Sequence, residues 1–254
     1  MVINLKKFNK VVREMKVRVE LHTHTKYSKD SLLNKWFYLF MLKIKKIKVV
    51  GITDHNEIDG AIEFKKFLDR HGIKVIVGEE ISTEKGEIIG LFIKKRIKPG
   101  LSVRDTMEEI KRQKGLVYIP HPYDEKRSKT VLPEDEISKN VDIIDIIEVH
   151  NGRNSKSYYS EKQLAIANRY PSLYKVVGSD AHTFFELGRN YIIMENFNNK
   201  HEFIKNLSSI VLIKNDCIAI SHQVTKIVRL LKLLKRGEFF ELYKIINRRI
   251  KKSK

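Results

Sequence analysis

Short apolar runs typical of buried β-strands alternate with amphipathic, helix-like runs over the first two-thirds of this 254-residue chain. The strand-like runs are apolar throughout, as in parallel strands that are covered on both faces. Repeated strand–helix units predict a parallel sheet with right-handed crossovers. The expected strands span 17–24, 49–55, 73–82, 87–93, 116–122, 142–151 and 173–182, with the third and fourth forming a hairpin across Lys85 and Gly86, and the expected helices span 32–47, 58–71, 102–114 and 155–169.

The pattern changes near residue 220, where two basic amphipathic helices separated by Gly237 are predicted. We therefore expect an α/β domain over residues 1–220 and a basic helical tail over 221–254. From residue 222 onward the chain has eleven lysines and arginines but two acidic residues, and the whole chain carries a net charge of +19. Such an excess favours anionic partners.

The apolar positions of the tail recur at helical spacing, for example at Ile227, Leu231, Leu234, Phe240, Tyr243, Ile246 and Ile250. This spacing favours packing on the main domain or on a second subunit. Nucleic acid bound through the basic surface is an alternative, and an anionic membrane surface is a less favoured one. The sequence does not indicate an oligomeric state.

Other features of the composition predict a cytoplasmic protein. No signal peptide is visible, and the longest apolar run, 36–42, is too short to span a bilayer. Cys217 is the single cysteine, which excludes an intrachain disulfide and a cysteine metal cluster.

Ionisable and polar side chains gather where six of the expected strands end. In β/α barrels and open α/β sheets this edge is where binding sites are built. His22 and His24 are two residues apart on one strand, so their imidazoles point the same way. Mixed imidazole and carboxylate ligands suit Zn²⁺, Mn²⁺ or Fe²⁺. The residues at these ends are His22, His24, Asp54, His55, Glu79, Glu80, His121, Glu148, His150, Asn151, Asp180 and His182.

Six short motifs in order, LHTHT, ITDHN, GEEIS, IPHP, IEVHNGR and GSDAH, resemble those of the polymerase and histidinol phosphatase (PHP) family. The resemblance extends from about Val19 to Arg189. It implies a distorted (β/α)7 TIM-like barrel with two or three divalent metal ions at its C-terminal mouth. The chemistry it implies is that of a hydrolase, a phosphatase or other phosphoesterase that hydrolyses phosphate esters.

The resemblance also implies roles for individual residues. His22, His24 and Asp180 would bind one ion, and Glu79, which follows Gly78, would bridge to a second. His121 would bind the second ion with a residue of the EVHN strand, either His150 or Asn151. Asp30, His55 and His182 would bind a third. Glu20 stands where the family usually has Asp.

The expected nucleophile is a hydroxide that bridges the first two ions. His22, His24, Glu79, Asp180 and His182 are the expected catalytic residues, with His182 or His55 as a candidate acid for the leaving group. Lys26, Arg153 and Arg189 follow rim motifs and are candidates for phosphate binding. The expected substrate is a nucleotide, an oligonucleotide or a small phosphorylated metabolite. The alternative function is a PHP-like module that binds nucleic acid or a protein partner without catalysis.

Overall fold

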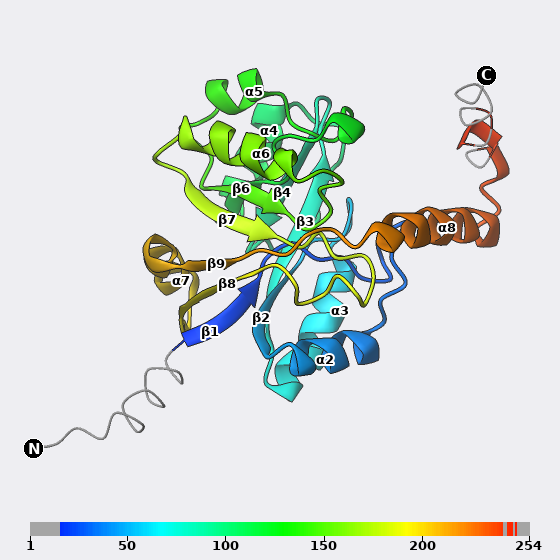
Figure 1. Cartoon of the computed structure of the whole chain (residues 1–254), viewed down its shortest axis with the longest axis horizontal. Helices are drawn as coiled ribbons and strands as arrows, with labels where there is room; N and C mark the ends of the chain where they lie inside the picture. Colours follow the sequence, from blue (N-terminus) through cyan, green and yellow to red (C-terminus); the bar gives the residue numbers. More distant parts are fainter. Residues whose placement is uncertain (1–15, 241–242, 246, 248–254) are drawn as a thin grey trace, which may run out of the picture.

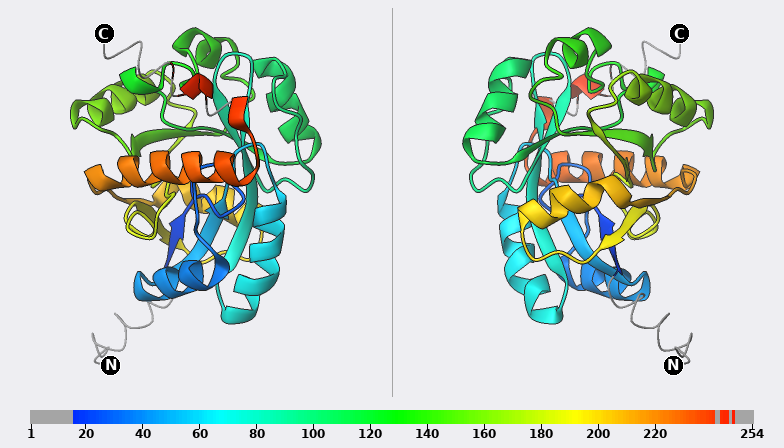
Figure 2. Two further views of the ribbon diagram at one scale, coloured as in Figure 1. Left: turned by 90° about the vertical axis from the view of Figure 1, so that its right-hand side faces the viewer. Right: turned by 90° about the vertical axis from the view of Figure 1, so that its left-hand side faces the viewer.

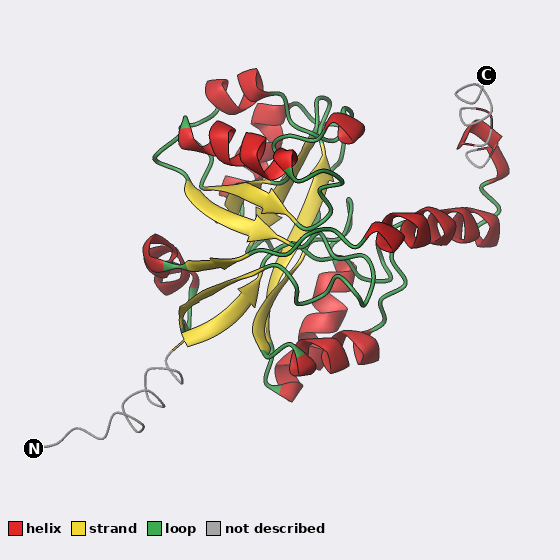
Figure 3. Cartoon of the chain, viewed as in Figure 1, coloured by secondary structure: helices red, strands yellow, loops and turns green. Residues whose placement is uncertain are grey.

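The computed structural model describes residues 16–240, 243–245 and 247, so the expected tail positions Ile246 and Ile250 lie outside the described residues. The described part is a mixed α/β structure whose strands curve around a common centre, with helices on the outside (Figures 1 and 3). No helix in these ranges is both long enough and apolar enough to cross a membrane.

Nine strands form one sheet in the order β7-β6-β5-β4-β3-β2-β1-β8-β9. Strands β1, β2, β3, β5, β6 and β7 run in the same direction, and β4 lies antiparallel between β3 and β5. The strands are β1 Lys16–Glu20, β2 Ile47–Ile52, β3 Lys74–Ser82, β4 Glu87–Leu91, β5 Leu116–Ile119, β6 Ile146–Asn151, β7 Tyr174–Gly178, β8 Tyr191–Glu195 and β9 Val211–Ile213.

The seven strands β1–β7 close into a distorted barrel at its C-terminal mouth. The segments that follow β1 and β7 meet there through a parallel bridge between Thr23 and Ala181. The backbone N–H of His24 donates to the carbonyl of Ala181, and that of Asp180 donates to the carbonyl of His22, both at 2.9 Å. The expected seven-stranded TIM-like barrel is therefore confirmed, and β8 and β9 extend the sheet beyond β1 as an antiparallel addition.

Helices cover the outside of the barrel on two flanks. Helices α2 and α3 pack along β2 and β3, and α4 and α6 pack along β4, β5 and β6. The helices are α2 Lys35–Ile44, α3 Asp59–Leu68, α4 Val103–Arg112, α5 Glu134–Lys139, α6 Tyr158–Asn168, α7 Lys200–Asn206 and α8 Ala219–Lys235, with short 3₁₀ segments η1 Asp69–His71, η2 Glu125–Arg127 and η3 Leu207–Ser209.

Local sequence explains where these elements begin and end. The hydroxyl of Ser102 accepts from the N–H of Asp105 and caps α4, as expected. Helix α4 then buries Val103, Met107 and Ile110 at helical spacing. The predicted hairpin of 73–82 with 87–93 is also present, with the N–H of Thr83 donating to the carbonyl of Gly86 in the turn.

The tail differs from the packed helix that its apolar pattern favours. Helix α8 buries only Ser221, Thr225 and Val228 among its residues, while Ile227 and Leu231 are more than half exposed. Figure 2 shows α8 lying across one side of the barrel. The helix therefore contacts the main domain mainly through small and polar side chains. In the described residues its apolar stripe is not packed on the main domain, and packing on a second subunit stays a prediction.

Candidate metal centre

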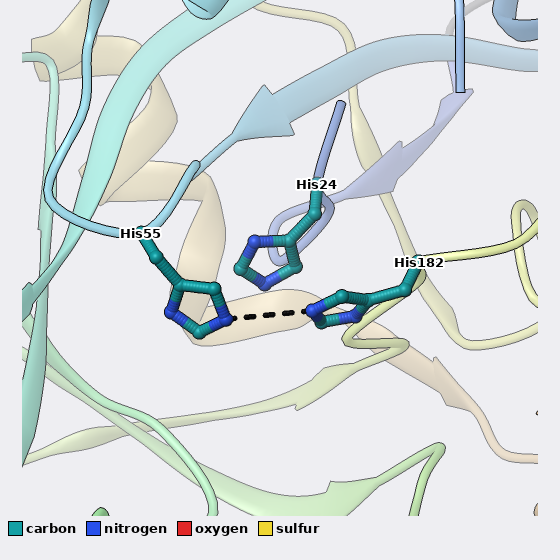
Figure 4. A group of neighbouring side chains, drawn as sticks. All are labelled: His24, His55 and His182. Atoms are coloured by element: carbon teal, nitrogen blue, oxygen red, sulfur yellow. Dashed lines mark hydrogen bonds between the residues drawn. The ribbon is translucent and has the colours of Figure 1, made fainter. Parts of the chain in front are cut away.

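The segments that follow the barrel strands bring histidines and carboxylates to one buried cluster. Three groups of side chains have donor atoms that all lie within 4.8 Å of one another: His22, His24 and Asp180; His24, His55 and His182; and His55, Glu80 and Glu87. Figure 4 shows His24, His55 and His182 pointing toward a common centre from the ends of three different strands.

Hydrogen bonds fix the tautomers of three of these histidines. Nδ1 of His22 lies 2.7 Å from a carboxylate oxygen of Glu148, and Nδ1 of His182 lies 2.8 Å from the carbonyl of Asp180, so both nitrogens must donate. Nδ1 of His24 lies 3.0 Å from the hydroxyl of Ser28, which gives its own proton to Asp54, so this nitrogen donates as well. Each Nε2 is then left with a lone pair directed into the cluster, which is the arrangement of a metal-binding imidazole.

Hydrogen bonds cannot pair all of the nitrogen and oxygen atoms that face one another in the cluster. Nε2 of His55 and Nε2 of His182 are 3.4 Å apart, a hydrogen bond in which His55 must donate because Nδ1 of His182 already carries the proton (Figure 4). Nδ1 of a neutral His55 then has no proton for the Glu80 carboxylate 3.0 Å away. Within the cluster, the buried atoms without a hydrogen-bond partner are His22 Nε2, His24 Nε2, Asp30 Oδ1, His55 Nδ1, Glu80 Oε2 and His121 Nδ1. Native proteins satisfy nearly all buried polar atoms, so this set fits bound divalent cations.

Asp180 is oriented by an arginine that the sequence did not single out. Nη1 of Arg127, in η2, lies 2.6 Å from Oδ2 of Asp180. Oδ1 of the same carboxylate then faces Nε2 of His24 at 3.4 Å and Nδ1 of His182 at 3.3 Å. Burial would raise the pKa of Asp180, but the charge of Arg127 above all holds it well below its usual range. Asp180 is therefore an ionised carboxylate with a fixed orientation, which suits a metal ligand.

Glu80, not Glu79, is the glutamate of β3 at the centre of the cluster. Its oxygens lie 3.1 Å from Nε2 of His121, 3.3 Å from Nε2 of His24 and 3.0 Å from Nδ1 of His55. Burial would raise the pKa of Glu80, but in the metal-free chain protonated His55 and His22 lower it well below its usual range. Glu80, and not its neighbour, therefore lies where a carboxylate could bridge two ions.

Glu79 points to the other face of β3, because successive side chains of a strand alternate between its faces. Its carboxylate accepts from the N–H of Ile97 at 2.9 Å, and burial raises its pKa to about 7. It belongs to none of the groups of potential ligands. The assignment of Glu79 as a catalytic residue and ligand does not agree with this geometry.

Glu148 of β6 supports the cluster without entering it. Its carboxylate accepts from His22 Nδ1, the Tyr118 hydroxyl, the His121 N–H and the Asn151 amide, at 2.6–2.9 Å. A side-chain carbon at Gly178 would lie 2.0 Å from one of its oxygens, so only glycine fits beside it. With four donors satisfied, Glu148 orients His22 in the way that carboxylates orient metal-binding histidines.

His150 and Asn151 do not reach the cluster. The register of β6 shifts between Glu148 and His150, so the two side chains do not share a face as strict alternation would require. Nδ1 of His150 contacts the Ser160 hydroxyl at 2.7 Å, and its Nε2 contacts the carbonyl of Asn215 at 3.1 Å. The expectation that one of these two residues binds a metal is not supported by their positions.

Asp30 does lie at the cluster, as expected. Its Oδ1 is 3.2 Å from Nε2 of His182 and 3.8 Å from Nε2 of His55. Glu87, at the start of β4, adds a carboxylate that the sequence reading did not consider, with Oε1 3.6 Å from Nδ1 of His55. Together with Glu80 it makes the side of the cluster near His121 rich in carboxylate oxygen.

The loop that carries Asp30 is held by α8. The ammonium of Lys232 donates to the carbonyls of Lys26, Ser28 and Ser31 at 2.6–2.7 Å. On the inner side of the loop, Ser28 and Thr25 donate to the buried carboxylate of Asp54. The position of Asp30 thus depends on contacts from two elements that are distant in sequence.

Replacing Lys232 with methionine is expected to weaken binding of the ion predicted at Asp30 by roughly five- to tenfold, because the loop loses three hydrogen bonds to one cation. Metal titration followed by calorimetry measures this. The matched control is Lys235→Met on the exposed side of α8, which should bind like the unaltered protein. Equal metal affinities for the two variants would show that Lys232 does not position the loop.

The three candidates for phosphate binding occupy different places. Arg153 is buried beside the cluster, with Nη1 3.5 Å from Glu186 and Nη2 2.9 Å from the Thr225 hydroxyl. Arg189 donates to the carbonyl of Asp216, away from the cluster. Lys26 is exposed and lies 3.4 Å from Glu63. Of these three, the structure brings only Arg153 to the mouth of the site.

Glu20 stabilises the base of the site. Its carboxyl contacts the hydroxyl of Ser179 and accepts from the N–H of Gly188, which ties β1 to the loop that carries Asp180 and His182. Complete burial raises the pKa of Glu20 to about 8. At neutral pH the folded chain therefore keeps this carboxyl protonated.

This raised pKa predicts a pH dependence of stability. The unfolded chain loses the Glu20 proton near its ordinary pKa of 4.5, whereas the folded chain holds it to about 8. The contribution of Glu20 to stability is therefore complete at low pH and declines as the pH rises across this window. Glu20→Gln should flatten the decline, measured by urea unfolding of metal-free protein at about pH 5 and about pH 8. Parallel profiles for the two proteins would contradict the assignment.

Comparison with known proteins agrees with this site. The model of the PHP domain matches residues 20–211. An uncharacterised protein of Methanocaldococcus jannaschii is 35% identical over 187 residues, covering 72% of each chain, and a second is 45% identical over 117 residues, covering 42% of this chain and 68% of the relative.

Two solved structures share the fold. One is provisionally assigned as a metal-dependent phosphoesterase of Bifidobacterium adolescentis, with a TM-score of 0.56 and 16% identity over 75% of this chain and 95% of that one. The other is an amidohydrolase of Chromobacterium violaceum, with a TM-score of 0.56 and 19% identity over 76% of this chain and 97% of that one. The matched family and the donor groups at the barrel mouth together support a metal-dependent hydrolase. The chain belongs to the PHP domain family.

Proposed function

We propose that this protein is a metal-dependent phosphoesterase. The main support is that the candidate metal ligands share a cavity of about 220 Å³ with four cationic side chains, Lys29, Arg127, Arg153 and Arg229. Asp30, His55, Asp180 and His182 line the same cavity. Cations placed beside metal ligands suit a substrate group with several negative oxygens, which an ester of phosphoric acid has and a neutral amide lacks.

The residues divide into those that hold ions and those that hold substrate. His22, His24, Glu80 and Asp180 would hold one ion, Glu80, Glu87 and His121 a second, and Asp30, His55 and His182 a third. Bound ions of this kind lower the pKa of water and neutralise charge on phosphate oxygens. The protein itself contributes fixed ligand orientation, through Glu148 on His22 and Arg127 on Asp180. It also contributes guanidinium groups that bind phosphate oxygens.

A larger adjoining cavity supports an anionic leaving group. This cavity of about 880 Å³ shares Arg127 and His222 with the first, and Lys126, Lys156 and Lys226 line its walls. Ser155, Ser157 and Gln223 add polar groups. A nucleotide or an oligonucleotide end would place its ester phosphate at the metal ligands and the rest of its charge in this cavity. A small neutral alcohol would make no use of the positive charge in this cavity.

The proposal is tested by hydrolysis assays on protein reconstituted with Mn²⁺, Fe²⁺ or Zn²⁺. The panel pairs p-nitrophenyl phosphate and nucleotides with p-nitrophenyl acetate and simple amides. Release of phosphate or nucleoside, without cleavage of the acetate or the amides, is the expected result. Cleavage of amides alone would overturn the proposal, and so would a lack of turnover on all substrates in metal-loaded protein.

Two arginine variants, one inside the cavity and one outside it, test where the substrate phosphate binds. Arg229→Ala should raise KM for phosphorylated substrates by about tenfold, because it removes a cation from the wall of the cavity. Arg189→Ala should leave KM nearly unchanged, because Arg189 contacts the carbonyl of Asp216 outside the cavity. The opposite result would place the phosphate near Arg189, as the sequence motifs suggested.

A further inference from the structure

Helices α2 and α8 lie on the same side of the molecule (Figures 1 and 2). Both expose apolar side chains to solvent. In α8 the stripe Ile220, Val224, Ile227, Leu231 and Leu234 follows alternating steps of four and three residues, so these side chains share one face of the helix. Their exposed fractions include 57% for Ile227 and 55% for Leu231. With 3.6 residues per turn, this face is centred roughly 110° around the helix from the one that buries Ser221, Thr225 and Val228.

Helix α2 has a similar exposed face made of larger side chains. Trp36 is 63% exposed and Phe40 is 60% exposed, and Phe37 and Ile44 lie beside them in sequence with comparable exposure. Tyr38 and Leu42, on the inner face, are buried. Soluble domains rarely leave so many aromatic and aliphatic side chains in contact with water unless another surface covers them.

Two contacts link α8 to the segments that carry the other exposed apolar side chains. Lys232 of α8 donates to the loop 26–31, which leads into exposed Leu32 and then α2. At the other end, the hydroxyl of Thr183 lies 3.4 Å from that of Ser221 in α8, and exposed Phe184 and Phe185 follow directly. The exposed apolar side chains of α2, of residues 184–185 and of α8 are therefore carried by segments that these two contacts link on one side of the molecule.

The charges around this surface are of one sign. Residues 31–48 contain five lysines and no acid, and residues 219–236 contain five lysines and arginines and no acid. Glu63 of α3 lies at the edge and is neutralised by Lys26 and Lys35, at 3.4 and 3.5 Å. The occupant of this surface must therefore combine apolar and anionic character.

We propose that the α2–α8 surface binds the interface of an anionic lipid membrane. Amphipathic helices with Trp, Phe and Leu on one face and Lys or Arg around it insert in this way, without crossing the bilayer. Two copies of this chain meeting through α8 would bring two basic helices together without a countercharge. Nucleic acid would pair with the cations but would leave the Ile, Val and Leu stripe exposed to water.

The test is flotation of the full chain with vesicles of phosphatidylglycerol and phosphatidylcholine in equal parts, compared with pure phosphatidylcholine. We expect binding to the anionic vesicles only. The double variants Ile227→Ser with Leu231→Ser, and Trp36→Ser with Phe40→Ser, should each bind about tenfold more weakly or worse. The matched control is Leu164→Ser on α6, an exposed apolar residue outside this surface, which should bind like the unaltered protein.

Retained hydrolytic activity in the double variants would show that they fold, since none of these residues lines the catalytic cavity. Three results would overturn the proposal. One is equal binding by the double variants and the Leu164→Ser control. A second is that the chain does not bind vesicles but forms a dimer in analytical ultracentrifugation, and that the α8 variant no longer forms this dimer. The third is binding to DNA but not to vesicles, with loss of DNA binding in the same variants.

Discussion

Glu80→Gln is expected to lower kcat/KM for phosphoester hydrolysis by about 10³-fold or more, whereas Glu79→Gln should change it by less than about threefold. The two residues are neighbours in sequence and both are buried, so the pair differs mainly in the direction of the side chain. Glu80 contacts His24, His55 and His121, while Glu79 accepts from the backbone at Ile97. Glutamine preserves the shape of each side chain but removes the charge that an ion requires.

Steady-state assays should be paired with metal analysis of the same samples. Glu80→Gln should also lose bound metal, while Glu79→Gln should retain the content of the unaltered protein. Thermal unfolding of both variants checks that the fold is intact. A large loss of activity in Glu79→Gln, with Glu80→Gln nearly normal, would reverse the assignment and restore the residue that follows Gly78 as the bridging ligand.

Glu148→Gln is expected to weaken metal binding by about 10- to 100-fold, although Glu148 is not itself a ligand. An amide has one accepting oxygen, so its NH₂ group must face either His22 and Tyr118 or the N–H of His121 and the Asn151 amide. Leaving buried donors unpaired should also destabilise the fold by about 3 kcal/mol. Calorimetric metal titration and urea unfolding measure the two effects.

Tyr118→Phe is the matched control for this prediction. It removes one donor from Glu148 but leaves the bond to Nδ1 of His22 in place, so metal affinity should stay within a few-fold of the unaltered protein. Metal affinity that is unchanged in Glu148→Gln would show that His22 holds its orientation without the carboxylate. In that case the ring packing around His22 would be the dominant constraint.

The barrel and most of the cluster could be predicted from the sequence because both depend on local patterns. Apolar runs of strand length alternate with amphipathic helices, and parallel strands place their C-terminal ends at one edge. His22, His24, His55, His121, Asp180 and His182 all follow such runs directly. The structure brings all six to the same rim, and Asp30 joins them from a loop.

The choice between Glu79 and Glu80 could not be made from the hydrophobic pattern. Strand β3 is apolar on both faces, so alternation does not reveal which face is inside the barrel. The prediction that His150 binds a metal assumed that its side chain points the same way as that of Glu148. The register shift in β6 between these two residues breaks that alternation. A single-residue irregularity of this kind has no clear signal in one sequence.

Arg127, Glu87 and the contacts of α8 depend on tertiary structure. Arg127 reaches Asp180 across 53 residues of sequence, and Lys232 reaches the 26–31 loop across about two hundred. In a chain with 50 lysines and arginines, composition cannot separate these two cations from those on the surface. Their positions are set by how distant segments pack at the mouth of the barrel.

Elemental analysis by mass spectrometry tests the central claim most directly, on untagged protein before and after incubation with Mn²⁺, Fe²⁺ or Zn²⁺ and desalting. The cluster predicts more than one tightly held ion per chain, with a lower content in Glu80→Gln and in His22→Ala. Protein that is folded by circular dichroism but retains no ion after reconstitution would contradict the account. The buried histidines and carboxylates at the barrel mouth would then need another explanation.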